Sequence, residues 1–452
     1  MRRLFPVAGL LILAGLLPGL LAACDSSGND SQQSVAAMMR TAVTPTPGPP
    51  TDTPGPTSTP TVTLTPEPPP TLALDMSEVK SQLARIEADT AKMRGLKPKA
   101  HVPEHFYSQA ELKYHLGQDT LKEYTVEAAH RDVIRLWLLM FIDDPTMDFR
   151  QLEVEFAGDN ILGYYDPKVK ELYVRADQPT LSPPSRETLA HEFTHSLQDQ
   201  YHNLSQFLPD NMDSDQATAH RALVEGDATV SGILYASRYM SMGDFRKIFS
   251  SDAVRPAVPG RAPVYLREAW QFPYAYGSEF ILSLAPPGSF KAVDAAFNDP
   301  PRSTEQIMHP EKYLNKPRDN PLPVTLPPLT DTLGAGWAFR ETDTLGEFDL
   351  QIMLRENFIE QPEASEGWGG ACYALYENGP DALVIMGSRW DTKRDASEFE
   401  DALEQSFKLF QKYDTLWHDS KRVWGLKRSG EQIMFVNGTN LAAVQRVIAS
   451  IK

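Results

Sequence analysis

The sequence predicts an α+β fold in which a mainly helical domain with a small sheet near its start precedes a small ββαββα-like domain. Apolar residues recur at helical spacing through much of residues 75–316, where short alternating segments also occur. In residues 367–452, pairs of short apolar segments joined by turn residues alternate with two helical patterns. The chain has 452 residues, of which 41% are hydrophobic, and this is enough for two or three domains.

The charge and the cysteine content exclude several classes of protein. The formal net charge is −17, so we expect no basic surface of the kind that binds nucleic acid. The two cysteines, Cys24 and Cys372, are too few for a disulfide framework or a cysteine-based zinc site. The sequence therefore predicts an acidic globular body without a nucleic-acid partner.

Residues 1–24 have the composition of a targeting segment. Arg2 and Arg3 precede a long apolar run, which ends in Leu21-Ala22-Ala23-Cys24. This ending resembles the bacterial lipoprotein signal peptide, in which the cysteine is lipidated and becomes the mature N-terminus. An ordinary signal peptide and an uncleaved membrane anchor are the alternatives. All three predict an extracytoplasmic protein, and lipidated Cys24 would anchor it to the cell membrane.

Residues 25–74 are expected to form a disordered tether. Pro and Thr make up most of residues 41–70. Such a composition buries little apolar surface and favours extended, polyproline-like backbone. The tether would hold the folded body away from the membrane.

The helical domain is expected over residues 75–316. Helices are predicted at Met76–Arg94, Glu127–Asp143, Thr188–Tyr201 and Asp215–Met240, and strands at Gln151–Phe156, Gly163–Asp166 and Glu171–Val174. The last two strands are expected to form a hairpin across Pro167-Lys168. Pro183-Pro184 is expected to interrupt regular secondary structure, and Ser185 is expected to cap the third helix after it.

That third helix contains His191-Glu192-Phe193-Thr194-His195, an H-E-x-x-H motif. On a helix, residues four apart lie about 40° apart around the axis, so both histidines point the same way and can bind one metal ion. Glu192 lies beside the pair and can reach a water on the metal. The opposite side of the helix is apolar, as expected for a helix that packs on a core and presents its histidines to a cleft.

The following helix supplies a candidate third ligand. Glu225 shares a face with small residues, where another helix can approach closely. A carboxylate on such a packed face is costly unless it is paired or binds a metal. Asp199 and Asp227 are alternative ligands, and pairing of Glu225 with Arg221 is the non-ligand interpretation.

Together, His191-Glu192-x-x-His195 and the later Glu225-Gly226-Asp227-Ala228 resemble the gluzincin zinc peptidases, which include the thermolysin-like and zinc aminopeptidase groups. The resemblance implies a zincin-like catalytic domain that binds Zn²⁺ through His191, His195 and Glu225. It also implies that Glu192 is the general base and that a strand preceding the helix with the two histidines binds the substrate backbone. The chain departs from the family in the 29 residues between His195 and Glu225, which are more than is usual.

Two later segments supply further catalytic candidates. Phe272–Phe280 resembles the Pro-Tyr-x-x-Gly segment of zinc aminopeptidases, in which the tyrosine hydroxyl stabilises the tetrahedral intermediate. Tyr274 matches that tyrosine and Tyr276 is the alternative. His309 lies in the polar segment Ser303–Tyr313, and it could donate a hydrogen bond to the substrate or to the oxyanion. A structural histidine that caps the turn before Pro310 is the other interpretation.

Residues 317–366 are expected to connect the helical domain to a C-terminal α+β domain at 367–452. Strands are predicted at Gly367–Tyr376, Asp381–Met386, Arg422–Leu426 and Gln432–Val436, and helices at Asp395–Tyr413 and Asn440–Ile451. Asn378-Gly379 is a strong signal for a tight hairpin turn between the first two strands. For Gly369-Gly370, a tight turn and a close backbone approach to substrate are both considered.

The resemblance implies a membrane-tethered zinc metallopeptidase that acts on a peptide or protein substrate. A non-catalytic extracellular binding lipoprotein that retains the zincin scaffold is the main alternative. A metal-dependent hydrolase of non-peptide substrates is another alternative, since the ligand set does not select the substrate. Two histidines and a glutamate favour zinc over other metals.

Overall fold

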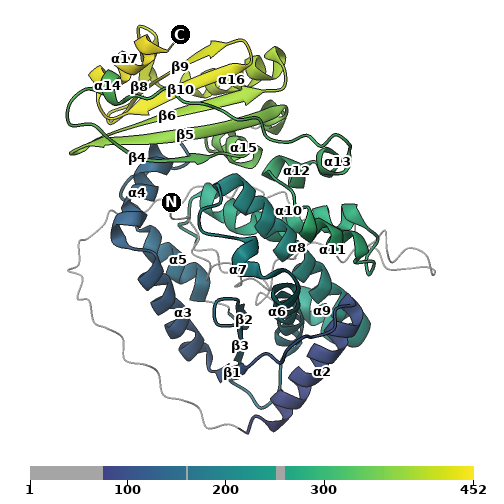
Figure 1. Cartoon of the computed structure of the whole chain (residues 1–452). Coiled ribbons are helices and arrows are strands. Elements are labelled where there is room, and N and C mark those ends of the chain that lie inside the picture. The colour runs from purple at the N-terminus through teal and green to yellow at the C-terminus, as the bar shows by residue number, and fades with distance from the viewer. Residues whose placement is uncertain (1–74, 159–160, 251–259, 358, 360, 452) are drawn as a thin grey trace, which may run out of the picture.

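The computed structural model describes residues 75–451 except for 159–160, 251–259, 358 and 360. The predicted signal segment 1–24 and the tether 25–74 lie outside the described residues. Mixed α/β architecture is confirmed, with helices forming one part and an antiparallel sheet near the C-terminus forming the other (Figure 1). Among the residues that the structure describes, no helix has the length and apolar character needed to cross a bilayer.

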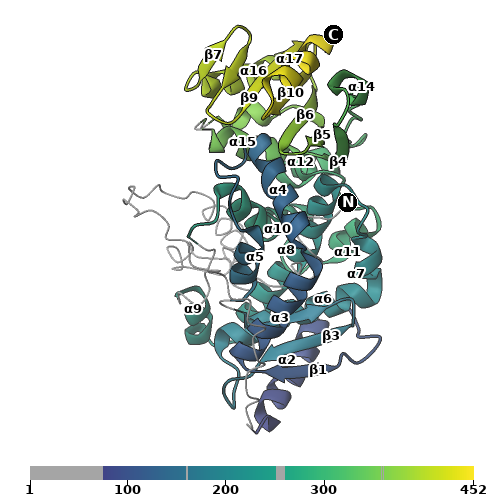
Figure 2. The same ribbon diagram turned by 90° about the vertical axis from the view of Figure 1, so that its left-hand side faces the viewer.

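The helical part contains most of the helices of the described chain. These are α2 (Ser77–Arg94), α3 (Gln109–Glu123), α4 (Val126–Leu138), α5 (Phe149–Gly158), α6 (Pro183–His202), α7 (Leu204–Phe207), α8 (Ser214–Tyr239), α9 (Met242–Ser250), α10 (Val264–Leu284), α11 (Lys291–Asn298), α12 (Thr304–Met308) and α13 (Pro310–Leu314). Helices α6, α8 and α10 lie at the centre of this part in both views (Figures 1 and 2). They carry the predicted metal ligands and Tyr274.

Helices α8 and α10 touch backbone to backbone. A Cβ atom added to Gly226 on α8 would lie 2.3 Å from the carbonyl carbon and oxygen of Gly277 on α10. A Cβ atom added to Gly277 would lie 2.2 Å from the carbonyl oxygen of Ala222. Only glycine allows this approach, so these two residues fix the spacing between the helices.

The small predicted sheet has three strands in the order β1-β3-β2: β1 (Glu104–Tyr107), β2 (Gly163–Asp166) and β3 (Glu171–Arg175). The predicted hairpin is confirmed, because β2 and β3 pair antiparallel, while β1 runs parallel to β3. Figures 1 and 2 show the sheet at the end of the helical part that lies farthest from the C-terminal sheet. Strand β2 is an edge strand, and it lies against α6.

The C-terminal sheet has seven antiparallel strands in the order β4-β5-β6-β10-β9-β8-β7. They are β4 (Ala338–Thr344), β5 (Trp368–Asn378), β6 (Asp381–Trp390), β7 (Gln411–Tyr413), β8 (Leu416–His418), β9 (Val423–Ser429) and β10 (Gln432–Gly438). The associated helices are α14 (Thr330–Leu333), α15 (Glu347–Glu356), α16 (Lys393–Phe407), α17 (Leu441–Ser450) and a 3₁₀ turn, η4 (Pro362–Ser365). The predicted β5–β6 turn is confirmed, with Gly379 at φ +59°.

Apolar side chains cover both faces of this sheet. On one face, Val444 and Val447 of α17 pack with Leu329 and Leu333 against the strands. On the other face, Phe399 and Phe407 of α16 belong to the large core that continues into the helical part. The two parts of the molecule therefore share one continuous core.

Helix α4 ends against the C-terminal sheet. It stops at Leu138 rather than at the predicted Asp143, because the backbone turns at Met140, whose φ is +63°. Two side chains bind its last carbonyls: Arg422, which immediately precedes β9, donates to Trp137 O at 2.6 Å, and Asn437 of β10 donates to Leu138 O at 2.7 Å. These bonds satisfy carbonyls that every helix leaves unpaired at its C-terminus.

The strand predicted at Gln151–Phe156 is wrong, since this segment belongs to α5. Its alternating apolar residues also satisfy helical spacing, because Phe149, Leu152 and Phe156 lie on one face. Phe149 and Leu152 are buried, and the ring of Phe156 stacks on Trp270 of α10 at 3.9 Å. Tertiary packing therefore selects the helical arrangement.

The predicted cap at Ser185 is also wrong. Helix α6 begins at Pro183, and the Ser182 hydroxyl accepts a hydrogen bond from the backbone N–H of Ser185 at 3.2 Å. Pro183 and Pro184 occupy the first helical turn, where the backbone lacks intrahelical acceptors and a missing N–H costs nothing. The two prolines therefore start the helix instead of separating it from the preceding chain.

The helix predicted at Asp395–Tyr413 ends earlier, at Phe407, and two short strands follow it. Strands β7 and β8 form a hairpin that was not predicted from the sequence. Asp414 has φ +57°, which is the turn conformation that Asp tolerates better than most residues. Asp414 was therefore the residue in the sequence that could have indicated a turn between these two strands.

The predicted connector at 317–366 contributes structure of its own. Its residues form β4, which pairs with β5 at the edge of the sheet, and helix α15. Leu322 lies across β5, where its N–H donates to Gly369 O at 2.6 Å, and a Cβ at Gly370 would lie 2.3 Å from Leu322 O. The two glycines therefore belong to a strand and admit the chain's own proline-rich segment.

Candidate metal centre

The two motif histidines come together on one side of α6. Their Nε2 atoms are 3.0 Å apart, and their rings meet edge to face with centroids 4.7 Å apart. His191 is 1% exposed and His195 is fully buried. The geometry follows from the four-residue spacing on a regular helix.

Glu225 of α8 completes a triangle of donor atoms. Its Oε2 lies 3.2 Å from His191 Nε2 and 3.3 Å from His195 Nε2. A tetrahedral zinc ion with bonds of about 2.0–2.1 Å has ligand atoms about 3.3 Å apart. The three donor atoms therefore have the spacing of three corners of a zinc coordination sphere.

The pKa shifts of His191 and Glu225 also fit a metal site. Burial lowers the pKa of His191, which favours the neutral imidazole. Burial raises the pKa of Glu225, but the two histidines outweigh that effect and bring it below its usual range. Two neutral imidazoles and an ionised carboxylate are the donor set that catalytic zinc sites use.

One oxygen of Glu225 is left without a hydrogen bond. Glu225 is fully buried, and its Oε1 has no hydrogen-bond partner among the described residues. A buried carboxylate in that state costs several kcal/mol unless a cation compensates it. The residues therefore fit a divalent metal in chemistry as well as in spacing.

The orientation of His195 is fixed by a neighbour on its own helix. Gln198 is one turn later on α6, and its Oε1 lies 2.8 Å from His195 Nδ1. The Gln198 amide nitrogen donates to Val224 O at 3.0 Å and to Asp227 Oδ2 at 2.8 Å. Because these bonds place the amide nitrogen away from the imidazole, His195 carries its proton on Nδ1 and its Nε2 has a free lone pair.

Glu192 lies beside the three candidate ligands, and only one of its two carboxylate oxygens has a hydrogen-bond partner among the described residues. Its Oε2 accepts a hydrogen bond from the Tyr165 N–H of β2 at 3.0 Å. Its Oε1 is buried and has no hydrogen-bond partner within the described ranges. Burial and the nearby charge of Glu225 raise its pKa well above the usual value. A carboxyl group with a raised pKa is suited to accept and return a proton.

Of the two candidate tyrosines, Tyr274 lies next to His191, a candidate metal ligand. Its ring and that of His191 are nearly parallel, with centroids 6.2 Å apart, and the residue is 5% exposed. The alternative, Tyr276, stacks on Phe272 at 4.8 Å and packs near Phe348. The structure therefore brings Tyr274, and not Tyr276, to the histidines.

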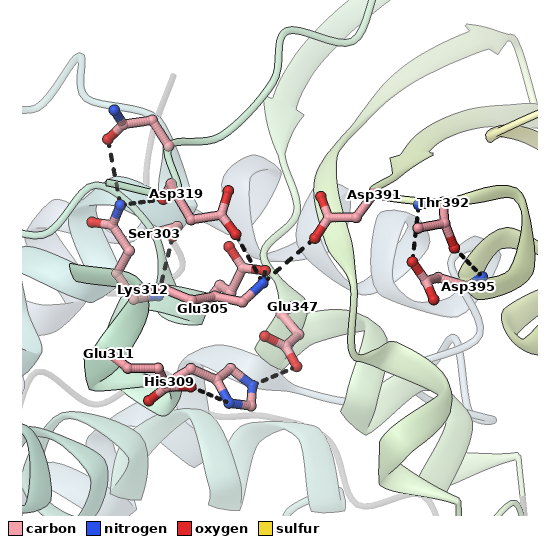
Figure 3. A network of polar contacts seen from close by, with 12 residues as sticks. Ser303, Glu305, His309, Glu311, Lys312, Asp319, Glu347, Asp391, Thr392 and Asp395 are labelled. Carbon is pink, nitrogen blue, oxygen red and sulfur yellow. Dashed lines mark hydrogen bonds and ion pairs between the residues drawn. The ribbon is translucent and has the colours of Figure 1, made fainter. Parts of the chain in front are cut away.

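His309 belongs to a different polar network, which Figure 3 shows. Its Nε2 lies 3.0 Å from Glu347 Oε1, and its Nδ1 lies 4.0 Å from Glu311. In the same view, Lys312 lies among the carboxylates of Glu305, Asp319 and Asp391. None of the polar contacts described for His309 is with a ligand residue, so they do not support its predicted role at the oxyanion.

The two alternative ligands have other partners. Asp199 accepts hydrogen bonds from the Tyr165 hydroxyl at 2.9 Å and from the Leu204 N–H at 2.8 Å. Asp227 pairs with Arg94 and Gln198. The contact of Gln198 with His195 was not predicted, although its position three residues after His195 on the same helix could have indicated it.

Comparisons with known proteins bear on the C-terminal part of the chain. A family described as a domain of unknown function (DUF8575) matches residues 336–448. No curated protein and no solved structure matches the chain. The matched range begins just before β4 and reaches into α17, so it covers the seven-stranded sheet and leaves the candidate metal centre outside.

Proposed function

We propose that the protein is a zinc-dependent metallopeptidase of the gluzincin type, with a zincin-like catalytic domain in its helical part. The observation that carries the proposal is the triangle of donor atoms from His191, His195 and Glu225, with sides of 3.0, 3.2 and 3.3 Å. These residues would hold the zinc ion. When bound, zinc would acidify a water molecule and polarise a substrate carbonyl.

Glu192 is the proposed general base. Its unpaired Oε1 accepts the proton of the attacking water, and the Tyr165 N–H holds its Oε2 in place. The same carboxyl group then gives the proton to the leaving amine of the cleaved peptide bond. Such transfers typically contribute 10²- to 10⁴-fold to the rate.

Tyr274 is the proposed oxyanion donor. It lies beside His191, and a phenol hydroxyl can donate to the oxygen on which charge develops during attack on a carbonyl. Preorganised donors of this kind typically contribute a hundredfold or more to the rate. For His309, the same role is supported only by its position in the sequence.

Strand β2 is the proposed site for the substrate backbone. It is an edge strand whose inner side pairs with β3, and on the other side its Tyr165 N–H reaches Glu192. An extended peptide can add to such an edge by main-chain hydrogen bonds. The four site residues are at most 1% exposed: His191, Glu192, His195 and Glu225. The parts of the chain that cover these residues must therefore move apart for a peptide substrate to reach them.

We further propose that the substrate is a peptide or protein outside the cytoplasm and that lipidated Cys24 tethers the enzyme to the membrane. The support for this is the Leu21-Ala22-Ala23-Cys24 motif and the Pro/Thr-rich segment that follows it. The acidic net charge of −17 argues against a nucleic-acid partner.

Hydrolysis of a peptide library by the purified protein tests the function, with products identified by mass spectrometry. We expect cleavage that stops when a chelator removes the metal and returns when zinc is added back. Zinc bound without any cleavage would contradict the peptidase proposal and favour the non-catalytic binding lipoprotein. Cleavage that continues in the fully stripped protein would also contradict it.

A further inference from the structure

The last residue of α2, Arg94, reaches deep into the helical part although its helix is the first of the described chain. Its side chain is fully buried and forms two bonds with Asp227 of α8: Nε to Oδ1 at 2.9 Å and Nη2 to Oδ2 at 3.1 Å. Its guanidinium also lies 4.3 Å from the ring centre of Phe290 and 2.7 Å from the half-exposed Asp294. The paired bonds fix both the position and the rotation of the Asp227 carboxylate.

Asp227 in turn holds Gln198 on α6, the helix that carries the two motif histidines. Its Oδ2 accepts the hydrogen bond from the Gln198 amide nitrogen at 2.8 Å, and Gln198 Oε1 lies 2.8 Å from His195 Nδ1. A continuous series of polar contacts thus joins α2 through α8 to a candidate zinc ligand on α6. Every side chain in this series from Arg94 to His195 is buried, so water does not compete for these bonds.

The arrangement decides which nitrogen of His195 carries the proton. A Gln198 amide turned by 180° would present N–H groups to Nδ1, and the proton of the imidazole would then move to Nε2. A protonated Nε2 has no lone pair for a metal. The Asp227 carboxylate and the Val224 carbonyl prevent this turn, because both accept from the amide nitrogen and would repel the amide oxygen.

We propose that Arg94 is a positioning residue of the metal centre. By holding Asp227 it locks the Gln198 amide, and the amide keeps His195 in the tautomer that binds metal. The docking of α2 is thereby coupled to metal binding. The inference rests on the proposed zinc site at His191, His195 and Glu225. It adds Arg94 as a positioning residue of that site, although Arg94 is 133 residues away in sequence from its partner Asp227.

Zinc dissociation constants of the full-length protein, measured by competition with a chromogenic chelator, test this inference. For Arg94→Met we expect binding to weaken about 10- to 100-fold, the usual effect of losing a residue that orients a metal ligand. Arg94→Lys keeps the positive charge but not the paired geometry, and it should fall between the wild type and Arg94→Met. It also keeps the experiment informative if Arg94→Met does not fold. Asp294→Asn, which breaks only the outer ion pair, is the matched control and should bind zinc as the wild type does.

A double-mutant cycle with Gln198→Leu separates positioning from a general effect on the fold. If Arg94 acts through Gln198, adding Arg94→Met to Gln198→Leu should weaken zinc binding little further. Equal weakening in both backgrounds, or wild-type affinity in Arg94→Met and Arg94→Lys, would overturn the inference. If the wild-type protein itself binds no zinc, the proposed metal site fails instead.

Discussion

Replacement of Glu192 by Gln is expected to lower the rate of peptide hydrolysis by about 10²- to 10⁴-fold, the range typical for the loss of a general acid–base group. The amide has nearly the same shape and can still accept the Tyr165 N–H through its oxygen, but it takes up no proton. Zinc content should stay at one ion per chain, because Glu192 is not in the donor triangle. Steady-state hydrolysis rates and metal content, measured on the same preparations, check both expectations.

Glu187 provides the matched control for this substitution. It lies one turn before His191 on α6, it is 9% exposed, and burial raises its pKa to about 7. It is outside the donor triangle, and its charge is the smallest of the effects that raise the pKa of Glu192, so Glu187→Gln should hydrolyse peptides at nearly the wild-type rate. Retained activity in Glu192→Gln, or an equal loss in both variants, would show that Glu192 is not the base.

Replacement of Gly226 by Ala is expected to destabilise the protein by about 3–5 kcal/mol, at the upper end for single substitutions. The new methyl group would lie 2.3 Å from the backbone of Gly277, and backbone, unlike a side-chain tip, has no alternative rotamer. Helices α8 and α10 would have to separate, which moves both Glu225 and Tyr274. Urea unfolding of the metal-free protein gives the loss of stability.

Gly117 shows what the same substitution does without a clash. It lies inside α3, and its added Cβ would meet Val154 at 3.5 Å, an ordinary contact distance. Gly117→Ala should raise the free energy of unfolding by roughly 0.5–1 kcal/mol through the better helix propensity of alanine. Similar stability of the two alanine variants would contradict the account of the α8–α10 contact.

The core of the candidate site could be predicted because it rests on local geometry. The four-residue spacing of His191 and His195 places them on one helical face, and the small residues around Glu225 indicate a close helix contact. Tyr274 came from a family resemblance, and the structure places it beside His191. His309 was a candidate because it lies in a polar segment, yet its described contacts belong to another network.

The parts that could not be predicted depend on distant residues. No sequence spacing relates Arg94 to Asp227, so the series of contacts behind His195 emerges only when three helices are packed. The same holds for α5, where alternating apolar residues fit a strand or a helix until Phe156 meets Trp270. In the C-terminal sheet, the turn signal at Asn378-Gly379 allowed the hairpin of β5 and β6 to be predicted. Strand β4 was not predicted, because it follows a proline-rich segment and was assigned to the connector.

Zinc content is the measurement that tests the central claim most directly. Elemental mass spectrometry of the wild-type protein and of Glu225→Ala, both purified with zinc present, gives the stoichiometry. We expect one zinc ion per wild-type chain and loss or marked weakening of binding in Glu225→Ala, because the variant removes one of three donor atoms. A folded wild-type protein without zinc, or one zinc ion held equally by both proteins, would contradict the proposed ligand set.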